Sequence, residues 1–255
     1  MRSRIASAAK RFVWRAAQAA GARLAAVSDR LYLEKDLQAP VHTRHSGAQS
    51  WREYLLAVAD KPGLRILEIG SREVTGPNLL RPRLQHATYV GFDFYPGDNV
   101  DVVGDAHRLS DYFTEPFDVI CSAAVLEHLA MPWLVAEEIA KVLKVGGLLF
   151  VETHFSYSSH ERPWNFFQFS DMGLKVLFCE PLGFECLEAT LQNPIIGRFS
   201  SLADRYLRFR PVTGLYCHSA FLGRKVREVS DFRWRSADLD AMVGGTRYPP
   251  AIEHA

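Results

Sequence analysis

The chain has few residues of the kinds that tie a protein to a metal, an oxidising compartment or a lipid bilayer. Its 255 residues include four cysteines, with no Cys-x-x-Cys pair and no histidine at metal-ligand spacing from them: Cys121, Cys179, Cys186 and Cys217. This pattern argues against a zinc site or a disulfide framework, so we expect no metal and a reducing compartment. No apolar run reaches the roughly 18 to 20 residues that a membrane span needs, since arginines and lysines interrupt each one. We expect a soluble, cytoplasmic protein.

Net charge is also almost absent. The formal charge is +1 at pH 7, so no overall electrostatic field would recruit nucleic acid. Hydrophobic residues make up 48% of the chain, which is enough for one domain with a sizeable core and an appended element.

The first 28 residues differ from the rest, because they are basic and no acidic residue occurs before Asp29. Apolar residues recur at helical spacing among the bases, which predicts a basic amphipathic helix. Such a helix can pack its alanine-rich face on the domain, or it can bind an anionic membrane surface or act as a targeting segment. We therefore expect three parts: a helical extension over 1–45, a main domain over 46–227 and an irregular tail over 228–255.

Two strand endings in the main domain indicate a nucleoside site. An apolar strand ends at Glu68, Ile69 and Gly70, and a second strand over 89–92 is followed by Asp93. A glycine turn after one parallel strand and a carboxylate after the next are what a nucleoside ligand needs at a sheet edge. Asp93 can accept hydrogen bonds from both ribose hydroxyls.

Helical and strand patterns alternate through the main domain. Helices are predicted at 49–59, 132–143 and 169–178, with a short or irregular one opening near 77, and strands at 65–69, 89–92, 100–103, 117–121, 148–152, 184–189 and 216–222. Such alternation implies right-handed crossovers. We expect an α/β fold: a Rossmann-like, seven-stranded, mostly parallel sheet with helices on both faces and an antiparallel C-terminal strand.

In this order and spacing, the segments resemble a known family. The motifs are Ile-Leu-Glu-Ile-Gly at 66–70, Val-Gly-Phe-Asp at 90–93, Gly-Asp-Ala at 104–106, Phe-Asp-Val-Ile-Cys-Ser at 117–122, Leu-Glu-His at 126–128 and Leu-Lys-Val-Gly-Gly-Leu at 143–148. Over residues 51–224 the chain resembles the class I S-adenosylmethionine-dependent methyltransferases, in particular the small-molecule and glycan-biosynthesis type with a Glu-His pair after the fourth strand. The resemblance implies S-adenosylmethionine as the cofactor.

The resemblance also implies a role for each residue of a cofactor site. Gly70 and Ser71 would form the turn beside the methionine part, and Glu68 would lie beneath it, orienting loop amides or meeting the ammonium group through water. The other cofactor-binding residues would be Asp93 for the ribose, Phe94 over the adenine, Asp105 and the Ala106 amide for the adenine edge, and Ser122 near the sulfonium. The structural alternative is that both aspartates cap loops and that Phe94 belongs to the core.

The glycine loop departs from the family pattern of an acidic residue followed by alternating glycines. Arg72 and Val74 stand where the later glycines belong, and Gly76 is displaced downstream. Either the loop is reshaped, with Ser71 and Gly76 compensating, or cofactor affinity is weakened.

Methyl transfer to a hydroxyl is helped by a base, because the oxygen must lose its proton. Candidates follow the fourth and fifth strands, where the substrate mouth of such a sheet opens: Glu127, His128, Glu152, His154 and His160. We predict His128 and His154 as catalytic residues, with neutral imidazole as the working form. The alternative is that the Glu-His pair is a structural feature at a helix start.

The segment 153–168 is the predicted acceptor pocket, because aromatic rings alternate there with hydrogen-bonding groups. We predict His160, Trp164 and Asn165 as substrate-binding residues, a combination suited to a sugar. The competing interpretation is that the aromatic residues form a hydrophobic lid or core.

These expectations combine into a methyltransferase that moves a methyl group from S-adenosylmethionine to an oxygen of a small polar or glycan-like acceptor. Two alternatives stay open. An NAD(P)-dependent oxidoreductase would share the sheet and also place an acidic residue about 20 residues beyond its glycines, although the Gly-x-Gly-x-x-Gly motif is missing. A non-catalytic scaffold of the same fold would account for Arg72 and Val74.

Overall fold

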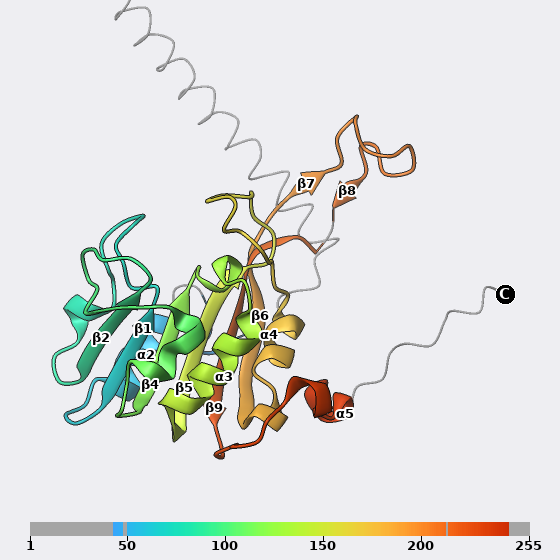
Figure 1. Cartoon of the computed structure of the whole chain (residues 1–255). Helices are drawn as coiled ribbons and strands as arrows, with labels where there is room; N and C mark the ends of the chain where they lie inside the picture. The colour runs from blue at the N-terminus through green and yellow to red at the C-terminus, as the bar shows by residue number, and fades with distance from the viewer. Residues whose placement is uncertain (1–42, 48–49, 213, 245–255) are drawn as a thin grey trace, which may run out of the picture. The chain divides into compact units, whose positions relative to one another are not determined.

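The structure, a computed structural model, describes residues 43–47, 50–212 and 214–244. The chain divides into two compact units, one made of residues 40–194 and 216–255 and the other of 1–39 and 195–215. The larger unit carries the α/β domain (Figure 1). The basic segment 1–28, and with it the expected amphipathic helix, lies outside the described residues. None of the described helices is long and apolar enough to cross a bilayer.

Seven strands form one sheet in the order β3-β2-β1-β4-β5-β9-β6. Their bounds are β1 (Arg65–Ile69), β2 (Thr88–Asp93), β3 (Val102–Val103), β4 (Phe117–Ala123), β5 (Leu143–His154), β6 (Phe184–Pro194) and β9 (Tyr216–Lys225). Neighbouring strands from β3 to β5 pair in parallel, whereas β9 runs antiparallel to both β5 and β6. The predicted sheet is therefore confirmed, and the carboxyl ends of β1, β2, β4 and β5 meet at one edge.

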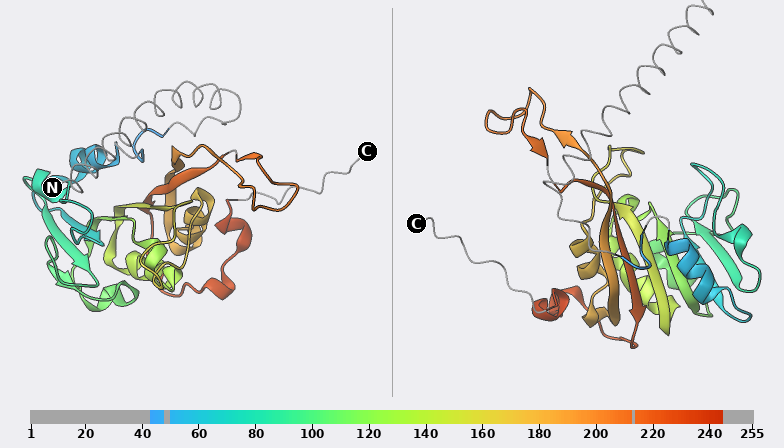
Figure 2. Two further views of the ribbon diagram at one scale, coloured as in Figure 1. Left: turned by 90° about the horizontal axis from the view of Figure 1, so that it is seen from above. Right: turned by 180° about the vertical axis from the view of Figure 1, so that it is seen from behind.

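Helices cover both faces of this sheet, as expected (Figure 2). On one face, α2 (Trp51–Ala59) buries its apolar side against the central strands, with Trp51 stacked on Phe150 at 4.3 Å between ring centroids. On the other face, α3 (Pro132–Val142) and α4 (Asp171–Leu177) pack on the opposite side chains of the same strands. Because side chains alternate along a strand, two apolar cores hold the central strands from both sides.

Several predicted elements differ in extent from the structure, and two of these differences have a clear local cause. The helix expected near residue 77 is reduced to a 3₁₀ turn at Arg81–Arg83, because Pro82 cannot donate a backbone hydrogen bond and the Asn78 side chain accepts from two backbone amides there. Strand β5 begins at Leu143 rather than at residue 148. Gly146, with a φ of 86°, lies within it where its register with β4 is irregular.

The expected irregular tail contains two short helical elements within residues 228–244, a 3₁₀ turn at Trp234–Ser236 and helix α5 (Leu239–Met242). Phe232, Trp234 and Met242 pack against the core on the α3 face. These apolar side chains lie among charged residues in the sequence, and their burial explains why this part of the chain folds onto the domain.

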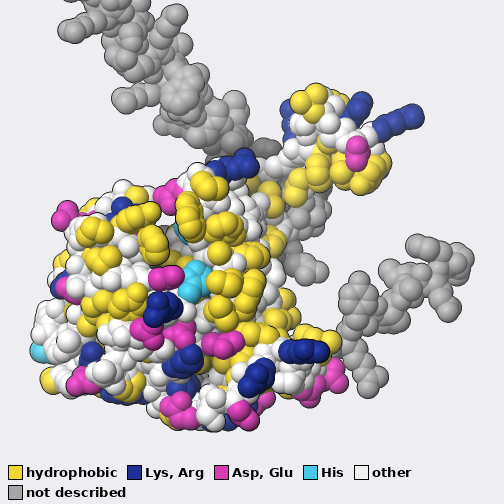
Figure 3. Space-filling model, viewed as in Figure 1, with side chains coloured by type: hydrophobic (Ala, Val, Ile, Leu, Met, Phe, Trp, Pro, Cys, Tyr) yellow, Lys and Arg dark blue, Asp and Glu magenta, His cyan; other side chains and the backbone are white. Residues whose placement is uncertain are grey.

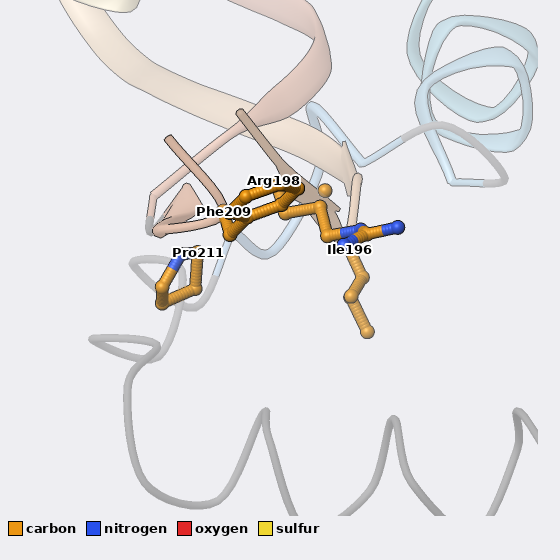
Figure 4. A pocket seen from close by; sticks show the side chains of 5 residues that line it. Ile196, Arg198, Phe209 and Pro211 are labelled. Carbon is orange, nitrogen blue, oxygen red and sulfur yellow. The ribbon is translucent and has the colours of Figure 1, made fainter. Parts of the chain in front are cut away.

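In the smaller unit, the described residues form a hairpin of β7 (Gly197–Arg198) and β8 (Pro211–Val212). The sequence indicated an irregular connection here. The Arg198 guanidinium lies over the Phe209 ring at 5.8 Å, and both line a pocket with Ile196 and Pro211 (Figure 4).

A buried lysine ties the sheet to the end of α3. Lys225, the last residue of β9, has a side chain that is 1% exposed. Its Nζ donates to the backbone oxygens of Ala140 and Leu143 at 2.6 and 2.7 Å and to Glu228 Oε2 at 2.7 Å. The last carbonyl groups of a helix lack intrahelical partners, so the ammonium group satisfies them and its charge is favourable there.

Replacing this lysine should destabilise the domain. We expect Lys225→Met to lower the free energy of unfolding by about 2 to 4 kcal/mol, because two buried carbonyl groups lose their donor. Urea unfolding followed by circular dichroism measures this. The matched control is Lys61→Met at an exposed position, which should change stability by no more than about 0.5 kcal/mol. Equal stability of the two variants would contradict the assignment.

Candidate active site

The turn after β1 has the backbone conformation that glycine favours, but its surroundings differ from the expectation. Gly70 has a φ of 78°, and its N–H donates to Phe92 O at 2.8 Å. A Cβ at this position would lie 2.1 Å from Val125 Cγ2. A side chain at position 70 would therefore clash with Val125 in the turn after β4. Glycine at this position lets the turns after β1 and β4 approach each other.

Glu68, two residues before this turn, contacts side chains rather than loop amides. Its Oε2 accepts from Tyr89 Oη at 2.5 Å and from Asn78 Nδ2 at 2.9 Å. Burial raises the pKa of the Glu68 carboxyl, and the two hydrogen bonds only partly oppose that shift. Ser71 is buried, and its Oγ donates to Asn99 O at 3.0 Å. Both residues brace the loops around β2.

The residue that breaks the glycine pattern contacts the residue predicted to bind the ribose. Arg72 Nε donates to Asp93 Oδ1 at 3.3 Å, and the Arg72 backbone N–H donates to Oδ2, also at 3.3 Å. Tyr95 N–H donates to Oδ1 at 3.0 Å, and the Arg72 guanidinium lies 5.5 Å from the Tyr95 ring. A ribose would therefore compete with the Arg72 side chain for the carboxylate.

The residues predicted for the adenine lie at the ends of β2 and β3. Phe94 is 56% exposed and packs edge-on against Tyr95, so it is not a core residue. Asp105 does cap a loop, because its Oδ1 accepts from His107 N–H at 3.0 Å and lies 2.6 Å from His107 Nδ1. Burial opposes ionisation of Asp105, but the hydrogen bonds from His107 outweigh it and hold the pKa below its usual value. Ala106 is buried in the core.

Ser122 has a buried hydroxyl that makes no hydrogen bond within the described residues. It lies near the end of β4, in register with Ile69 of β1 and Val151 of β5. A buried hydroxyl without a partner is costly. Its position beside the β1 turn fits a polar ligand group at this edge.

Just beyond β4, a sharp turn carries the Glu-His pair. Ala124 takes a left-handed φ of 54°, which is unusual for a residue other than glycine, and residues Leu126–His128 form a 3₁₀ turn. Glu127 is fully buried. Its Oε1 lies 2.7 Å from His154 Nδ1, and its Oε2 accepts from Thr153 Oγ1 at 2.7 Å. The end of β5 and the turn after β4 therefore meet through one carboxylate.

The buried carboxylate of Glu127 is held in its ionised form. Burial disfavours the charge, but the hydrogen bonds from His154 and Thr153 outweigh it, so the pKa of Glu127 is lowered. Because Nδ1 of His154 faces this carboxylate, the neutral imidazole carries its proton on Nδ1 and leaves the Nε2 lone pair free. Both residues were candidates in the sequence, and the structure brings them together.

The segment between β5 and α4 folds back over the Glu-His pair. Backbone N–H groups of Phe166 and Phe167 donate to Glu127 O at 2.8 and 3.3 Å, and Phe169 N–H donates to His154 O at 2.9 Å. This return brings His160 to His128, with 4.8 Å between their ring centroids. The face that carries α3 shows histidine among hydrophobic side chains at the surface (Figure 3).

The other predicted acceptor residues lie in the same segment. Trp164 is 58% exposed and packs edge-on against Phe166, with 5.8 Å between ring centroids. Asn165 is partly buried. Trp164 is therefore not a core residue, whereas Glu152, another candidate base, is largely buried and has a pKa raised by that burial.

Sequence reasoning missed His218. It pairs with His154 across β5 and β9, with 5.2 Å between the rings, and its Nδ1 lies 2.8 Å from Asn193 Nδ2. Burial and the nearby His154 lower the pKa of His218. The available signal was its place at the start of an antiparallel strand, which begins at the edge where the parallel strands end.

A comparison with known families agrees with this arrangement. Residues 41–177, more than half of the chain, match the methyltransferase domain family. The chain belongs to this family. Its seven-stranded sheet with the antiparallel β9 is the Rossmann-like sheet predicted from the sequence. The oxidoreductase alternative is therefore set aside.

Solved structures similar to the chain have low sequence identity. They include an S-adenosylmethionine-dependent methyltransferase from Archaeoglobus fulgidus, with 16% identity, a TM-score of 0.47, and coverage of 68% of this chain and 94% of that one. YcgJ from Bacillus subtilis has 14% identity and a TM-score of 0.46, covering 69% and 98% of the two chains. TehB from Haemophilus influenzae has 17% identity and a TM-score of 0.44, covering 68% and 60%. No curated protein matches the chain.

The family implies S-adenosylmethionine as the methyl donor, and the residues at the sheet edge fit its nucleoside part. A carboxylate ends β2, an exposed aromatic ring follows it, and a second carboxylate follows β3. The unpaired Ser122 hydroxyl adds a buried polar group beside the β1 turn. Three donors already contact the Asp93 carboxylate, namely the backbone N–H groups of Arg72 and Tyr95 and the Arg72 side chain, and of these the side chain is the one that can swing away from a ribose.

This conflict predicts opposite effects for two substitutions. Asp93→Ala should weaken binding of S-adenosylhomocysteine by about 1.5 to 3 kcal/mol, because charge-assisted hydrogen bonds are lost. Arg72→Ala should strengthen binding by up to roughly fivefold, because a half-exposed ion pair of this kind is worth at most about 1 kcal/mol. Isothermal titration calorimetry measures both, and Asp98→Ala in the same loop, at an exposed position, is the control. Unchanged affinity of Asp93→Ala would exclude Asp93 from the site.

Proposed function

We propose that this methyltransferase transfers the methyl group to a hydroxyl oxygen of a small polar or glycan-like acceptor. The observation that carries the proposal is the Glu127–His154 pair, a buried, ionised carboxylate 2.7 Å from the Nδ1 of a histidine at the end of β5. Amines that react in their neutral form can do without such a base, whereas a hydroxyl must give up its proton as the new bond forms.

In the proposed reaction, the protein supplies alignment and a proton acceptor. S-adenosylmethionine, when bound, supplies an activated methyl group on its sulfonium. Glu127 fixes the tautomer and ring orientation of His154 through Nδ1, so that the lone pair on Nε2 can take the acceptor's proton. The carboxylate then stabilises the imidazolium that forms. Most of the remaining rate enhancement would come from positioning in a water-poor site.

The acceptor is proposed to bind against the segment that returns from β5 to α4. Exposed Trp164 and Phe166 rings offer flat apolar surfaces, and Asn165 and the nearby histidines offer hydrogen-bonding groups. Sugars bind to such combinations, because their C–H faces stack on aromatic rings while their hydroxyls are recognised singly. The membrane contact predicted for residues 1–28 and the cytoplasmic location stay predictions.

An acceptor screen tests this proposal. The purified protein is incubated with methyl-labelled S-adenosylmethionine and panels of monosaccharides, oligosaccharides, phenols, amines and thiols, and the products are analysed by mass spectrometry. We expect an ether-linked methyl group on a hydroxylated acceptor. Methylation confined to nitrogen, carbon or sulfur would overturn the proposed acceptor class. Binding of S-adenosylhomocysteine without turnover on any panel would favour the non-catalytic scaffold.

Substitutions of the predicted catalytic residues should separate chemistry from cofactor binding. His154→Ala should lower kcat by about 100-fold to 10,000-fold, the range for loss of a general base, and should leave the affinity for S-adenosylhomocysteine unchanged. Steady-state kinetics and calorimetry measure the two effects. His86→Ala, at an exposed position away from β5, is the control. A kcat within about threefold of the control would leave catalysis to proximity and remove His154 from the role of base.

A further inference from the structure

Two side chains of the turn after β4 and one of the segment that returns from β5 place ligand atoms close together. The ligand atoms of Glu127, His128 and His160 all lie within 4.8 Å of one another. We propose that these residues bind one divalent transition-metal ion, with Glu127 and the Nε2 atoms of His128 and His160 as ligands. No metal was expected from the sequence, because no histidine lies at metal-ligand spacing from the cysteines, whereas these three ligands come together only in the fold.

The two imidazoles are already oriented as metal ligands. His128 Nδ1 is hydrogen-bonded to Trp164 O, and His160 Nδ1 lies 2.9 Å from Ser158 O. A backbone carbonyl can only accept, so in its neutral form each ring carries the proton on Nδ1 and has a lone pair on Nε2 for a metal. Metal-ligating histidines are held in this way, with the second ring nitrogen donating to a carbonyl or carboxylate.

The carboxylate is ionised and fixed before any metal arrives. Glu127 is fully buried, and Thr153 and His154 hold its two oxygens at 2.7 Å each. An oxygen of a carboxylate has a second lone pair, so Oε1 can accept from His154 and still bind a cation. A positive ion beside Glu127 would also offset the cost of burying its charge.

The ligand atoms, which lie within 4.8 Å of one another, must move closer together to share one ion. His128 Nε2 lies 4.0 Å from Glu127 Oε1, whereas two ligand atoms on a tetrahedral ion with bonds of about 2.1 Å stand roughly 3.4 Å apart. The 3₁₀ turn holds Glu127 and His128, while His160 lies in the returning segment and is only partly buried. His160 can therefore close the site by a shift of its own segment.

The donor set favours borderline metals over magnesium or calcium. Two imidazoles and one carboxylate suit Zn²⁺, Fe²⁺, Co²⁺ or Mn²⁺, whereas Mg²⁺ and Ca²⁺ prefer oxygen ligands. Three protein ligands leave at least one coordination position for an oxygen of the acceptor or for water. Glu161 Oε2, 3.9 Å from His128 Nε2, adds a second negative charge near the site.

A metal bound here would assist the methyl transfer proposed above, and its catalytic role rests on that proposed function. A bound cation polarises a coordinated hydroxyl and lowers its pKa, so the acceptor oxygen would lose its proton to His154 more readily. The metal would also fix which hydroxyl of a polyol is presented. Metal binding itself needs neither the donor nor an acceptor, so it can be tested apart from methyl transfer.

The test is a titration of untagged, metal-free protein with Co²⁺, followed by its visible absorption and by calorimetry. We expect one ion per chain. His128→Ala and His160→Ala should each weaken the affinity by more than roughly 100-fold, since loss of an outer-shell partner alone costs 10-fold to 100-fold. Thr153→Val, which removes only a hydrogen bond to Glu127, should show that smaller loss. His86→Ala should bind as the unmodified chain does.

Two outcomes would overturn the proposal. One is the absence of a stoichiometric site, and the other is equal affinity in the His128→Ala, His160→Ala and control proteins. Thermal unfolding and calorimetry with S-adenosylhomocysteine check that each variant is folded. X-ray absorption of the unmodified chain loaded with Zn²⁺ adds a measurement that needs no variant: two imidazole ligands are expected, and sulfur ligands would contradict the assignment. If the protein binds Co²⁺ as expected but methylates no hydroxyl, the proposed metal site stands and only the proposed reaction is wrong.

Discussion

The interaction on which the site depends is the burial of the Glu127 carboxylate between the turn after β4 and the end of β5. An ionised group in this position is unfavourable unless hydrogen bonds compensate for the lost solvent. Thr153 donates one to Oε2, and the His154 ring places Nδ1 2.7 Å from Oε1, both from β5. The pairing therefore fixes the relative position of two chain segments that carry the candidate chemistry, and it sets the tautomer of the histidine.

The same residue organises the acceptor side of the site through its backbone. Glu127 O accepts from two amides of the returning segment, and the neighbouring His128 binds the carbonyl of Trp164. Through these contacts a segment without regular secondary structure keeps His160 beside the Glu-His pair and presents aromatic rings to solvent. One short 3₁₀ turn thus contacts His154, the proposed base, carries two of the proposed metal ligands, and holds the segment proposed to bind the methyl acceptor.

The loop after β1 shows how the fold accommodates an altered glycine motif. Arg72, at a position where the family has glycine, points its guanidinium at Asp93 and packs near Tyr95. The reshaped loop keeps a positive φ at Gly70, and Ser71 is tied to the loop after β2. With Asp93 in the ribose-binding role that the family resemblance implies, nucleoside binding would exchange one partly exposed ion pair for ribose hydrogen bonds. Such an exchange costs little, so the altered loop is compatible with a functional cofactor site.

The sequence by itself determined the fold class, a seven-stranded and mostly parallel sheet, and the edge where a ligand would bind, whereas the order of the strands in the sheet came from the structure. The fold class and the edge follow from local patterns, since apolar runs ending in Gly70 or Asp93 mark strand ends and the helix signals lie between them. It also indicated the candidate base residues, because side chains just after β4 and β5 must lie at that edge. The extent of β5 and the short helices after residue 228 were missed, since a glycine pair and scattered apolar residues have no clear periodicity.

Only the tertiary structure decided which of those side chains meet. The pairing of Glu127 with His154, the approach of His160 to His128, the contact between Arg72 and Asp93 and the presence of His218 all join residues distant in sequence. No local pattern encodes such contacts, because they depend on how the strands register and on how an irregular segment folds back. A buried carboxylate satisfies its hydrogen bonds with whatever donors the fold brings within reach, and that choice is made by packing.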